Sequence, residues 1–257
     1  MIKIDTITQC NKLFSQETLH PLVSVLCLAD TRCIDLLQLG FYAILLRGHS
    51  LCSSCYGWKN CDFSAGTLLF LPPKQAIQTD QWVDKKNGEN YLLCFHPNLI
   101  CCSSLEQQIA NYSFFNYQQS EALHISAREK QVIVNCINDI SEELQWGIDE
   151  FSRMIILNKI ELLLNYSARF YHRQFITRHI PNECIVEKTN QHLESYFQTH
   201  QVQHGGLQFI KYCAQKQNLS PAYLEDVLKH QTGKNVWEYI QSKIWLSSCV
   251  QSAPFNG

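Results

Sequence analysis

The sequence lacks an excess of charge of either sign. Its 257 residues contain 21 Lys and Arg against 23 Asp and Glu, which gives a formal net charge of -2. The protein as a whole therefore lacks the cationic excess with which to hold nucleic acid or an anionic membrane. Any binding to DNA must come from a local surface.

Long apolar runs are also missing. The first ten residues, MIKIDTITQC, have no apolar core behind a basic flank, and the longest early apolar run, LVSVLCLA, is far too short to span a bilayer. We therefore expect a cytoplasmic protein with no membrane partner. The chain is long enough for one large domain or two modest ones with real cores.

The motifs of common enzymes do not occur. A metal-dependent cupin enzyme needs a histidine-x-histidine pair with a glutamate a few residues on, whereas His49 is isolated and His96 precedes a proline. The sequence has no glycine-rich phosphate loop, no nucleophile elbow and no HExxH. We expect neither catalysis nor a cofactor.

Cysteine, by contrast, is abundant, with 13 residues. The odd count and the lack of an export signal argue against a disulfide framework. Several cysteines lie inside apolar runs, where a free thiol behaves as a small hydrophobe: Cys27, Cys94, Cys136 and Cys213. We expect mostly reduced core residues.

One cysteine cluster has the residue types of a zinc site. The stretch GHSLCSSCYGWKNC offers three thiols and an imidazole, from His49, Cys52, Cys55 and Cys61. A lone CxxC without a second well-spaced pair is a weak signal. We expect ordinary turn and strand residues here, and no bound metal.

Residues 1–120 are expected to form an antiparallel β domain. Short runs rich in Val, Leu, Phe and Tyr are separated by Gly, Pro, Asn and Asp: HPLVSVLCLA, FYAILLRG, GTLLFLPP and NYLLCFHP. Such spacing predicts a barrel or sandwich, which can enclose a ligand cavity. Aromatic residues that can line such a cavity, or simply fill the core or its rim, are Tyr42, Tyr56, Trp58 and Trp82.

Residues 121–171 are expected to form a helical hairpin. Ser126 and Glu129 make a capping box, and Gly147 closes the first helix. Apolar residues then recur at helical spacing: Ile133, Cys136, Ile137, Ile140 and Leu144 in the first helix, and Ile155, Ile156, Ile160, Leu163 and Tyr166 in the second. Both stripes can pack on the barrel and on each other, or part of the wider second stripe can pair with a second copy of the protein.

The polar residues 172–184 are expected to link this hairpin to a last helical part, 185–246, followed by an irregular tail, 247–257. Within that part, Ser220 is an N-cap, Pro221 stands at the first helical position and Gly233 stops the helix. Only the three residues NLS separate this helix from the preceding one, and the small residue Ala214 is expected at the contact between the two helices. Two short helices joined by a tight turn predict a helix-turn-helix.

The residues around this turn resemble the first helix-turn-helix of the AraC/XylS transcription regulators. The positions that match are Ala214, Leu219, Ser220, Tyr223, Leu224, Lys229, Thr232, Gly233, Tyr239 and Ile240. The earlier segments are similar to the family's cupin-like barrel and its dimerisation hairpin, so the resemblance covers roughly residues 19–245. It implies an α+β fold and a one-component bacterial regulator that senses a small molecule and binds promoter DNA as a dimer.

The family pattern has a second helix-turn-helix beyond a long joining helix, and we expect it to be missing here. After Leu246 the sequence reads SSCVQSAPFNG, rich in Ser and broken by Pro254. The apolar residues Ile244, Trp245 and Leu246 would then be exposed or repacked.

The candidate DNA-contacting residues belong to the predicted helix that begins at Pro221. Ala222, Glu225 and Asp226 would face the major groove and Tyr223 and Lys229 the phosphates, with Ser220 at the helix start. Two carboxylates are unusual in a helix that recognises DNA bases. Arg, Lys, Asn and Gln make the strong base contacts, and acidic side chains near phosphate are repelled by it. Six lysines and six acids from residue 181 onward cancel. We expect weak or undetectable DNA affinity from this chain alone, and the alternative is a DNA-binding-deficient dimerisation or ligand-binding protein.

Overall fold

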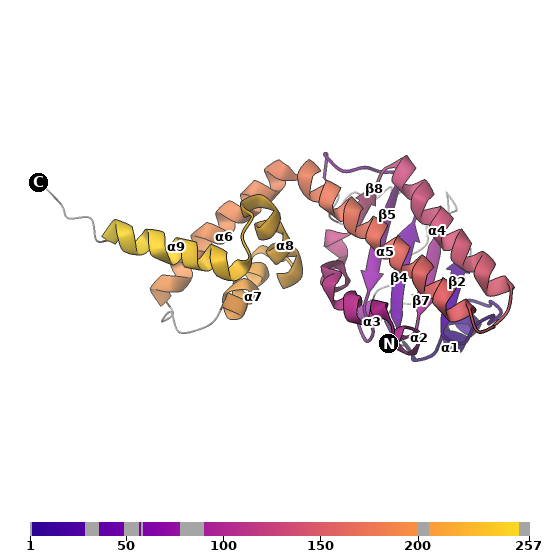
Figure 1. The fold of residues 1–257 in the computed structure, drawn as a ribbon. Coiled ribbons are helices and arrows are strands. Elements are labelled where there is room, and N and C mark those ends of the chain that lie inside the picture. The colour runs from indigo at the N-terminus through magenta and orange to yellow at the C-terminus, as the bar shows by residue number, and fades with distance from the viewer. Residues whose placement is uncertain are drawn as a thin grey trace, which may run out of the picture. The chain divides into compact units, whose positions relative to one another are not determined.

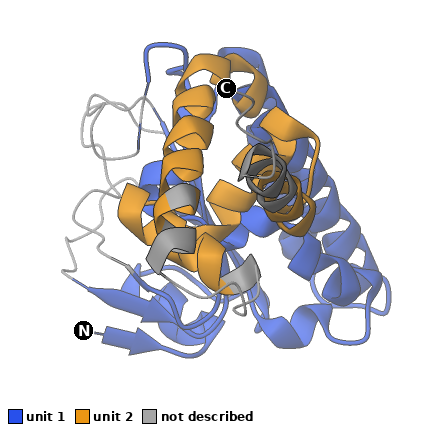
Figure 2. Ribbon diagram, turned by 90° about the vertical axis from the view of Figure 1, so that its left-hand side faces the viewer, with its two compact units in different colours: residues 1–174 blue, residues 175–257 orange. Residues whose placement is uncertain are grey.

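The computed structural model describes residues 2–28, 36–48, 57, 59–77, 90–199 and 206–251, and the side chains of the last helix as far as Lys243. The chain divides into two compact units, Met1–Gln174 and Phe175–Gly257 (Figure 2). The first combines sheets with helices and the second is helical, so the fold class is α+β (Figure 1).

Two sheets make up the β part of the first unit. Neighbouring strands of the larger sheet are antiparallel throughout, in the order β2-β7-β4-β5-β8. The smaller sheet has the order β1-β3-β6, and its pair β1-β3 is parallel, against the expectation of a purely antiparallel domain. The strands are β1 (Ile2–Ile4), β2 (Val23–Cys27), β3 (Leu37–Leu39), β4 (Tyr42–Arg47), β5 (Gly66–Leu71), β6 (Ala76–Ile77), β7 (Tyr91–Phe95) and β8 (Leu123–Ile125).

The two sheets share one apolar core. Because side chains alternate along a strand, the register that pairs Leu45 with Leu69 and Leu92 places all three on one face of the larger sheet. That face and the smaller sheet, with Leu37 and Leu39, contribute to a single buried cluster. Helix α1 (Ile7–Leu13) closes this cluster with Ile7, Cys10 and neighbouring residues. The described strands therefore form an open two-sheet arrangement, and a closed barrel is not confirmed.

The opposite face of the larger sheet carries Ile44, Leu46 and Phe70 and is covered by helices (Figure 1). Phe70 packs on Phe114, with ring centroids 4.4 Å apart, and Phe114 stacks on Tyr171 of α5 at 5.3 Å. Short helical turns link β7 to β8: α2 (Pro97–Ile100), α3 (Ser104–Gln108), η1 (Ile109–Asn111), η2 (Ser113–Asn116) and η3 (Gln119–Glu121). These aromatic contacts anchor the helices to the sheet.

The four apolar runs predicted as strands are confirmed as β2, β4, β5 and β7. The predicted domain boundary at residue 120 is too early, because β8 lies beyond it and pairs with β5. Its three residues, LHI, are too short to stand out in the sequence.

Two long helices form the predicted hairpin, α4 (Ala127–Gln145) and α5 (Ser152–Thr177). The capping box is confirmed, since Ser126 Oγ accepts from the Glu129 amide and the Glu129 carboxylate from the Ser126 amide. Every residue of the first stripe is buried, and Ile156, Ile160 and Leu163 of the second are buried as well. Gly147, with φ 91°, follows the C-cap Trp146.

The second unit contains α6 (His179–Thr199), α7 (Gly206–Gln217), α8 (Pro221–Thr232) and α9 (Val236–Gln251). The expected linker 172–184 is helical on both sides of Arg178. Pro181 is compatible with this because it falls in the first turn of α6, where a missing amide costs nothing. The expected irregular tail is likewise helical as far as Gln251, since Pro254 restricts only the residues just before it. The side chains of Ile244, Trp245 and Leu246 lie outside the described residues.

Candidate nucleic-acid interface

The turn between α7 and α8 is built by three adjacent residues. Asn218 takes a left-handed conformation, with φ 53°, and the amide of Leu219 donates to the carbonyl of Ala214 at 2.9 Å. Ser220 then caps α8, because its Oγ accepts from the Tyr223 amide at 3.1 Å, and Pro221 occupies the first position. The chain therefore reverses in a short, defined turn, as the sequence predicted.

A buried apolar core joins α7 and α8 to the rest of the second unit. Ala214 and Cys213 of α7 and Leu224 and Leu228 of α8 are fully buried. Burial raises the pKa of the Cys213 thiol to about 12, so the thiol stays protonated and behaves as an apolar group. This core fixes α8 against α7, and among the described residues one face of α8 is left to solvent.

The solvent face of α8 carries most of the predicted DNA-contacting residues. Glu225 and Lys229 are exposed, and Ala222 and Asp226 are half-buried. Gly233, with φ 70°, ends the helix directly after them. The structure thus brings these four side chains together on one surface with two carboxylates and one ammonium group.

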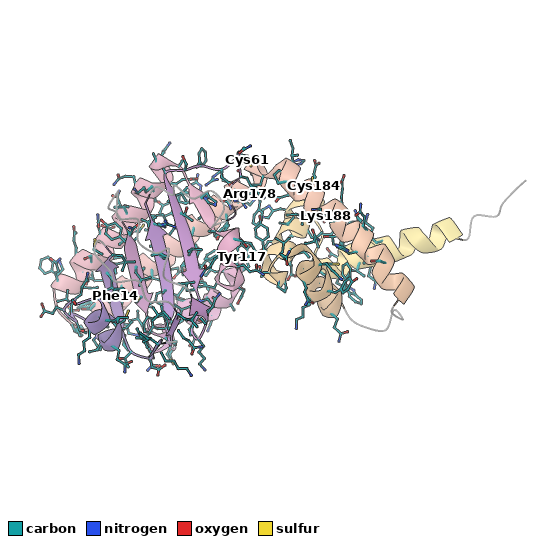
Figure 3. All side chains as sticks on the ribbon, turned by 180° about the vertical axis from the view of Figure 1, so that it is seen from behind. Phe14, Cys61, Tyr117, Arg178, Cys184 and Lys188 are labelled. Carbon is teal, nitrogen blue, oxygen red and sulfur yellow. The ribbon has the colours of Figure 1, made fainter. Side chains whose placement is uncertain are left out.

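Tyr223 does not lie on this face, contrary to the expectation that it lies near the phosphates. Its side chain is 2% exposed, its hydroxyl accepts from Arg178 Nη1 at 3.4 Å, and its ring packs on Phe175. Arg178 is labelled in Figure 3. Ser220 is also buried, and its hydroxyl is engaged in the cap. Both side chains therefore stabilise α8 from its buried side and do not belong to the surface that faces DNA.

Other exposed residues of the second unit were not among the predicted DNA contacts. Trp237, in the first turn of α9, is 58% exposed. Lys211 and Lys216 of α7 and Lys234 after α8 are also exposed. Such residues can supply an aromatic platform and phosphate contacts. The only sequence signal for Trp237 was its position just after the helix stop.

Ser220 provides a direct test of the local geometry. Replacing Ser220 with alanine removes the oxygen that satisfies a free amide of α8, so we expect a loss of about 1 kcal/mol in the free energy of unfolding of the second unit. Denaturant unfolding followed by hydrogen exchange of α8 measures this loss. Ser220→Thr keeps the hydroxyl and is expected to retain most of the stability; an equal loss in both variants would contradict the cap.

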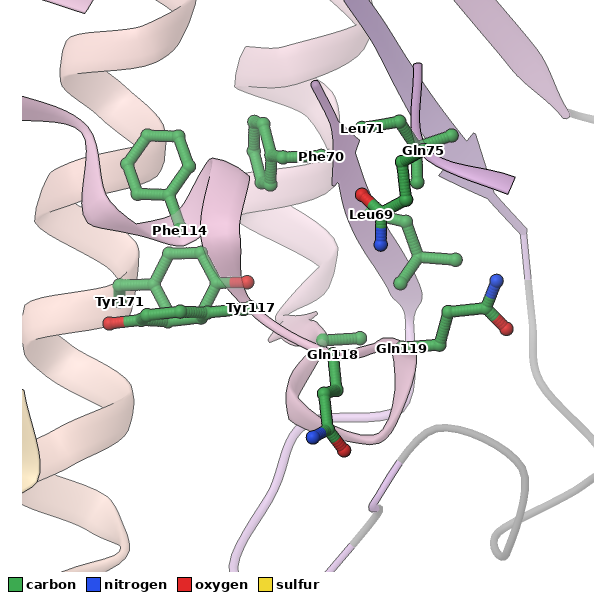
Figure 4. Close-up of a pocket in the computed structure, with 10 residues that line it drawn as sticks. Leu69, Phe70, Leu71, Gln75, Phe114, Tyr117, Gln118, Gln119 and Tyr171 are labelled. Atoms are coloured by element: carbon green, nitrogen blue, oxygen red, sulfur yellow. The ribbon is translucent and has the colours of Figure 1, made fainter. Parts of the chain in front are cut away.

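A small hollow lies in the first unit beside β5 and α5 (Figure 4). Tyr117 packs edge-on against Tyr171, with centroids 5.3 Å apart, and Phe114 stacks on the same ring. The Gln75 amide oxygen is buried and accepts no hydrogen bond from the described residues. The hollow is lined by Leu69, Phe70, Leu71, Gln75, Phe114, Tyr117, Gln118, Gln119, Ala122 and Tyr171.

The earlier ligand and metal candidates are mostly outside the described residues. This holds for the aromatic residues Tyr56, Trp58 and Trp82 and for the zinc candidates His49, Cys52 and Cys55. Of the remaining two, Tyr42 stacks on Phe95 at 5.1 Å and serves as core, and Cys61 is an exposed free thiol.

Comparison with known protein families, curated proteins and solved structures finds no match to this chain. Among the helices of the described residues, none combines the length and the apolar character that crossing a bilayer requires. The functional argument therefore depends on the geometry of the chain itself.

Proposed function

We propose that this chain is an AraC-type transcription regulator that contacts promoter DNA through α7 and α8. The observation that carries the proposal is the tight turn that sets α8, capped by Ser220, against α7 through a buried core, with one face left to solvent. A helix presented in this way can enter the major groove while its partner helix crosses the backbone. The first unit, with two sheets around one core, is assigned as a cupin-like sensor in the same proposal.

The charges on α8 limit the affinity of such a contact. Glu225 and Asp226 repel phosphate, although a carboxylate can accept from the amino group of cytosine. Lys229 of α8, together with the exposed Lys211 and Lys216 of α7 and Lys234 just after α8, supplies the attraction. We therefore expect binding that is weak and strongly dependent on salt.

A dimer of this chain would present two copies of α8 to DNA. The turn between α4 and α5 exposes Trp146, Ile148 and Phe151, which are 86%, 62% and 54% exposed, and Met154 and Leu162 of α5 are exposed as well. Several exposed large apolar side chains within one short stretch of sequence are typical of an interaction surface. We propose that a homodimer forms through this surface.

The dimer proposal predicts the effect of two substitutions on mass in solution. Met154→Asp combined with Leu162→Asp places two charges on the surface without disturbing the core, so we expect a shift from dimer to monomer by analytical ultracentrifugation. Asn135→Asp, on the exposed side of α4, is the control and should remain dimeric. A dimer that survives the double substitution would exclude this surface.

Small-molecule sensing is assigned to the first unit as a whole. The hollow beside β5 encloses about 10 Å³, which is about the room that one water molecule needs, so it is too small to be the effector site.

A gel-shift experiment tests the DNA-binding proposal. The full-length protein is mixed with DNA from upstream of its own gene and, separately, with a scrambled duplex of equal length. A complex that prefers the upstream DNA and weakens with salt supports the regulator. No complex at micromolar protein supports the second candidate, a DNA-binding-deficient dimerisation or ligand-binding protein, which Glu225 and Asp226 on the solvent face of α8 favour.

A further inference from the structure

Three side chains of types that can ligate a metal lie close together in the first unit, two on the turn between α2 and α3 and one in α3. The Sγ atoms of Cys101 and Cys102 are 3.7 Å apart, and a carboxylate oxygen of Glu106 joins them with all three ligand atoms within 4.8 Å of one another. All three residues are exposed to solvent, and both thiols are free. Nothing in the proposed regulator function uses them.

The backbone explains why two adjacent side chains converge here. Successive side chains of an extended segment point to opposite sides, so neighbouring thiols are normally separated. Cys102 instead has a left-handed conformation, with φ 58°, which residues other than glycine rarely adopt. Its amide donates to Glu106 Oε2 at 2.7 Å, and this bond ties the carboxylate to the same turn.

Hydrogen bonds from Arg153 of α5 also hold this turn in place. Arg153 Nε donates to the carbonyl of Leu99 at 3.0 Å, and Arg153 Nη2 donates to the carbonyl of Cys101. The amide of Ser103 donates to the carbonyl of Ile100 at 3.1 Å. The thiols therefore stand on a backbone that its neighbours hold in place, which reduces the entropy lost on binding a metal.

The spacing fits a tetrahedral zinc ion. With Zn–S bonds of about 2.3 Å, two thiolates on one tetrahedral zinc are about 3.8 Å apart, and a thiolate and a carboxylate oxygen about 3.5 Å. The first separation matches the Sγ–Sγ distance without movement. The Glu106 oxygen lies within 4.8 Å of both sulfurs, so the second separation requires a change in the Glu106 side-chain torsions.

The geometry points to a binding site for one thiophilic divalent cation, Zn²⁺ in the first instance, held by Cys101, Cys102 and Glu106 with solvent as the fourth ligand. Both thiols lose their protons to solvent when the cation binds, so affinity rises with pH. The hydrogen bond to Cys102, the charge of that neighbour and the charge of Glu106 raise the pKa of the Cys101 thiol, while Arg153 lowers it. A bound cation offsets the repulsion between these three anionic groups.

The site is tested by titrating the reduced full-length protein with Co²⁺ and then displacing the cobalt with Zn²⁺. Thiolate ligation is reported by a sulfur-to-cobalt charge-transfer band, and bound zinc is counted after gel filtration. We compare the wild type with Cys101→Ser/Cys102→Ser and with Glu106→Gln. The double variant is expected to bind one zinc ion fewer per chain and to lose the charge-transfer band of this site. Glu106→Gln is expected to bind zinc at least about tenfold more weakly.

The matched control removes two other exposed thiols, Cys61 and Cys184, which belong to different units and are labelled in Figure 3. Cys61→Ser/Cys184→Ser is expected to keep the zinc and the charge-transfer band that the other double variant loses. The proposal is overturned if the Cys101→Ser/Cys102→Ser protein binds as much zinc as the wild type, or if the control loses it instead. Either result is independent of DNA binding, so the site and the regulator proposal fail separately.

Discussion

Leu224→Ala is expected to lower the free energy of unfolding of the second unit by about 2–5 kcal/mol. Leu224 is fully buried between α7 and α8, and alanine leaves a cavity that these short helices cannot fill by a small movement. Because the chain has two units, a single two-state transition is not expected. Hydrogen exchange followed by mass spectrometry resolves the loss in α7 and α8 from the behaviour of the sheets.

Glu225→Ala serves as the control for this prediction. Glu225 follows Leu224 directly but is exposed, so its replacement is expected to change stability by no more than about 0.5 kcal/mol. Equal losses from the two variants, or a loss that spreads evenly into the first unit, would contradict the packing described for the second unit.

Charge reversal on α8 is expected to strengthen DNA binding by roughly a hundredfold at low salt. In Glu225→Lys/Asp226→Lys, two groups that repel phosphate become two that attract it. Each new phosphate contact also releases counterions, so the slope of the logarithm of affinity against the logarithm of salt concentration is expected to steepen by about two. Fluorescence anisotropy of a labelled duplex over a range of salt concentrations measures both effects.

The control for this experiment carries the same net charge elsewhere. Glu183→Lys/Glu187→Lys reverses two exposed acids on α6, a different helix of the same unit. If this protein bound DNA as tightly as the α8 variant, the gain would come from total charge, and α8 would have no special role at the interface.

Much of the second unit could be predicted because its helix ends carry local signals. Ser220 and Pro221 at one end of α8, and Gly233 at the other, mark its limits through caps whose geometry depends on only a few residues. Ala214 was correctly assigned to the contact between α7 and α8 for a similar reason, since only a small side chain allows close approach.

What sequence reasoning missed depends on contacts between distant segments. Strands β1 and β8 have three residues each and exist because β3 and β5 offer free edges to them. Tyr223 was assigned to the phosphates because nothing in its neighbourhood in sequence showed that Arg178 and Phe175 cover it. Helix α1, by contrast, does carry a local signal, the capping box of Thr6 and Gln9.

Site-specific photo-crosslinking tests most directly whether α8 is the DNA-contacting helix. A photoreactive amino acid is placed at Ala222 on α8 or at Glu187 on α6, and each protein is irradiated with DNA from upstream of its gene. We predict efficient crosslinks from position 222, reduced by excess unlabelled upstream DNA more than by scrambled DNA, and few from position 187. Crosslinks from position 187 alone, or equal crosslinking to both duplexes, would contradict the account.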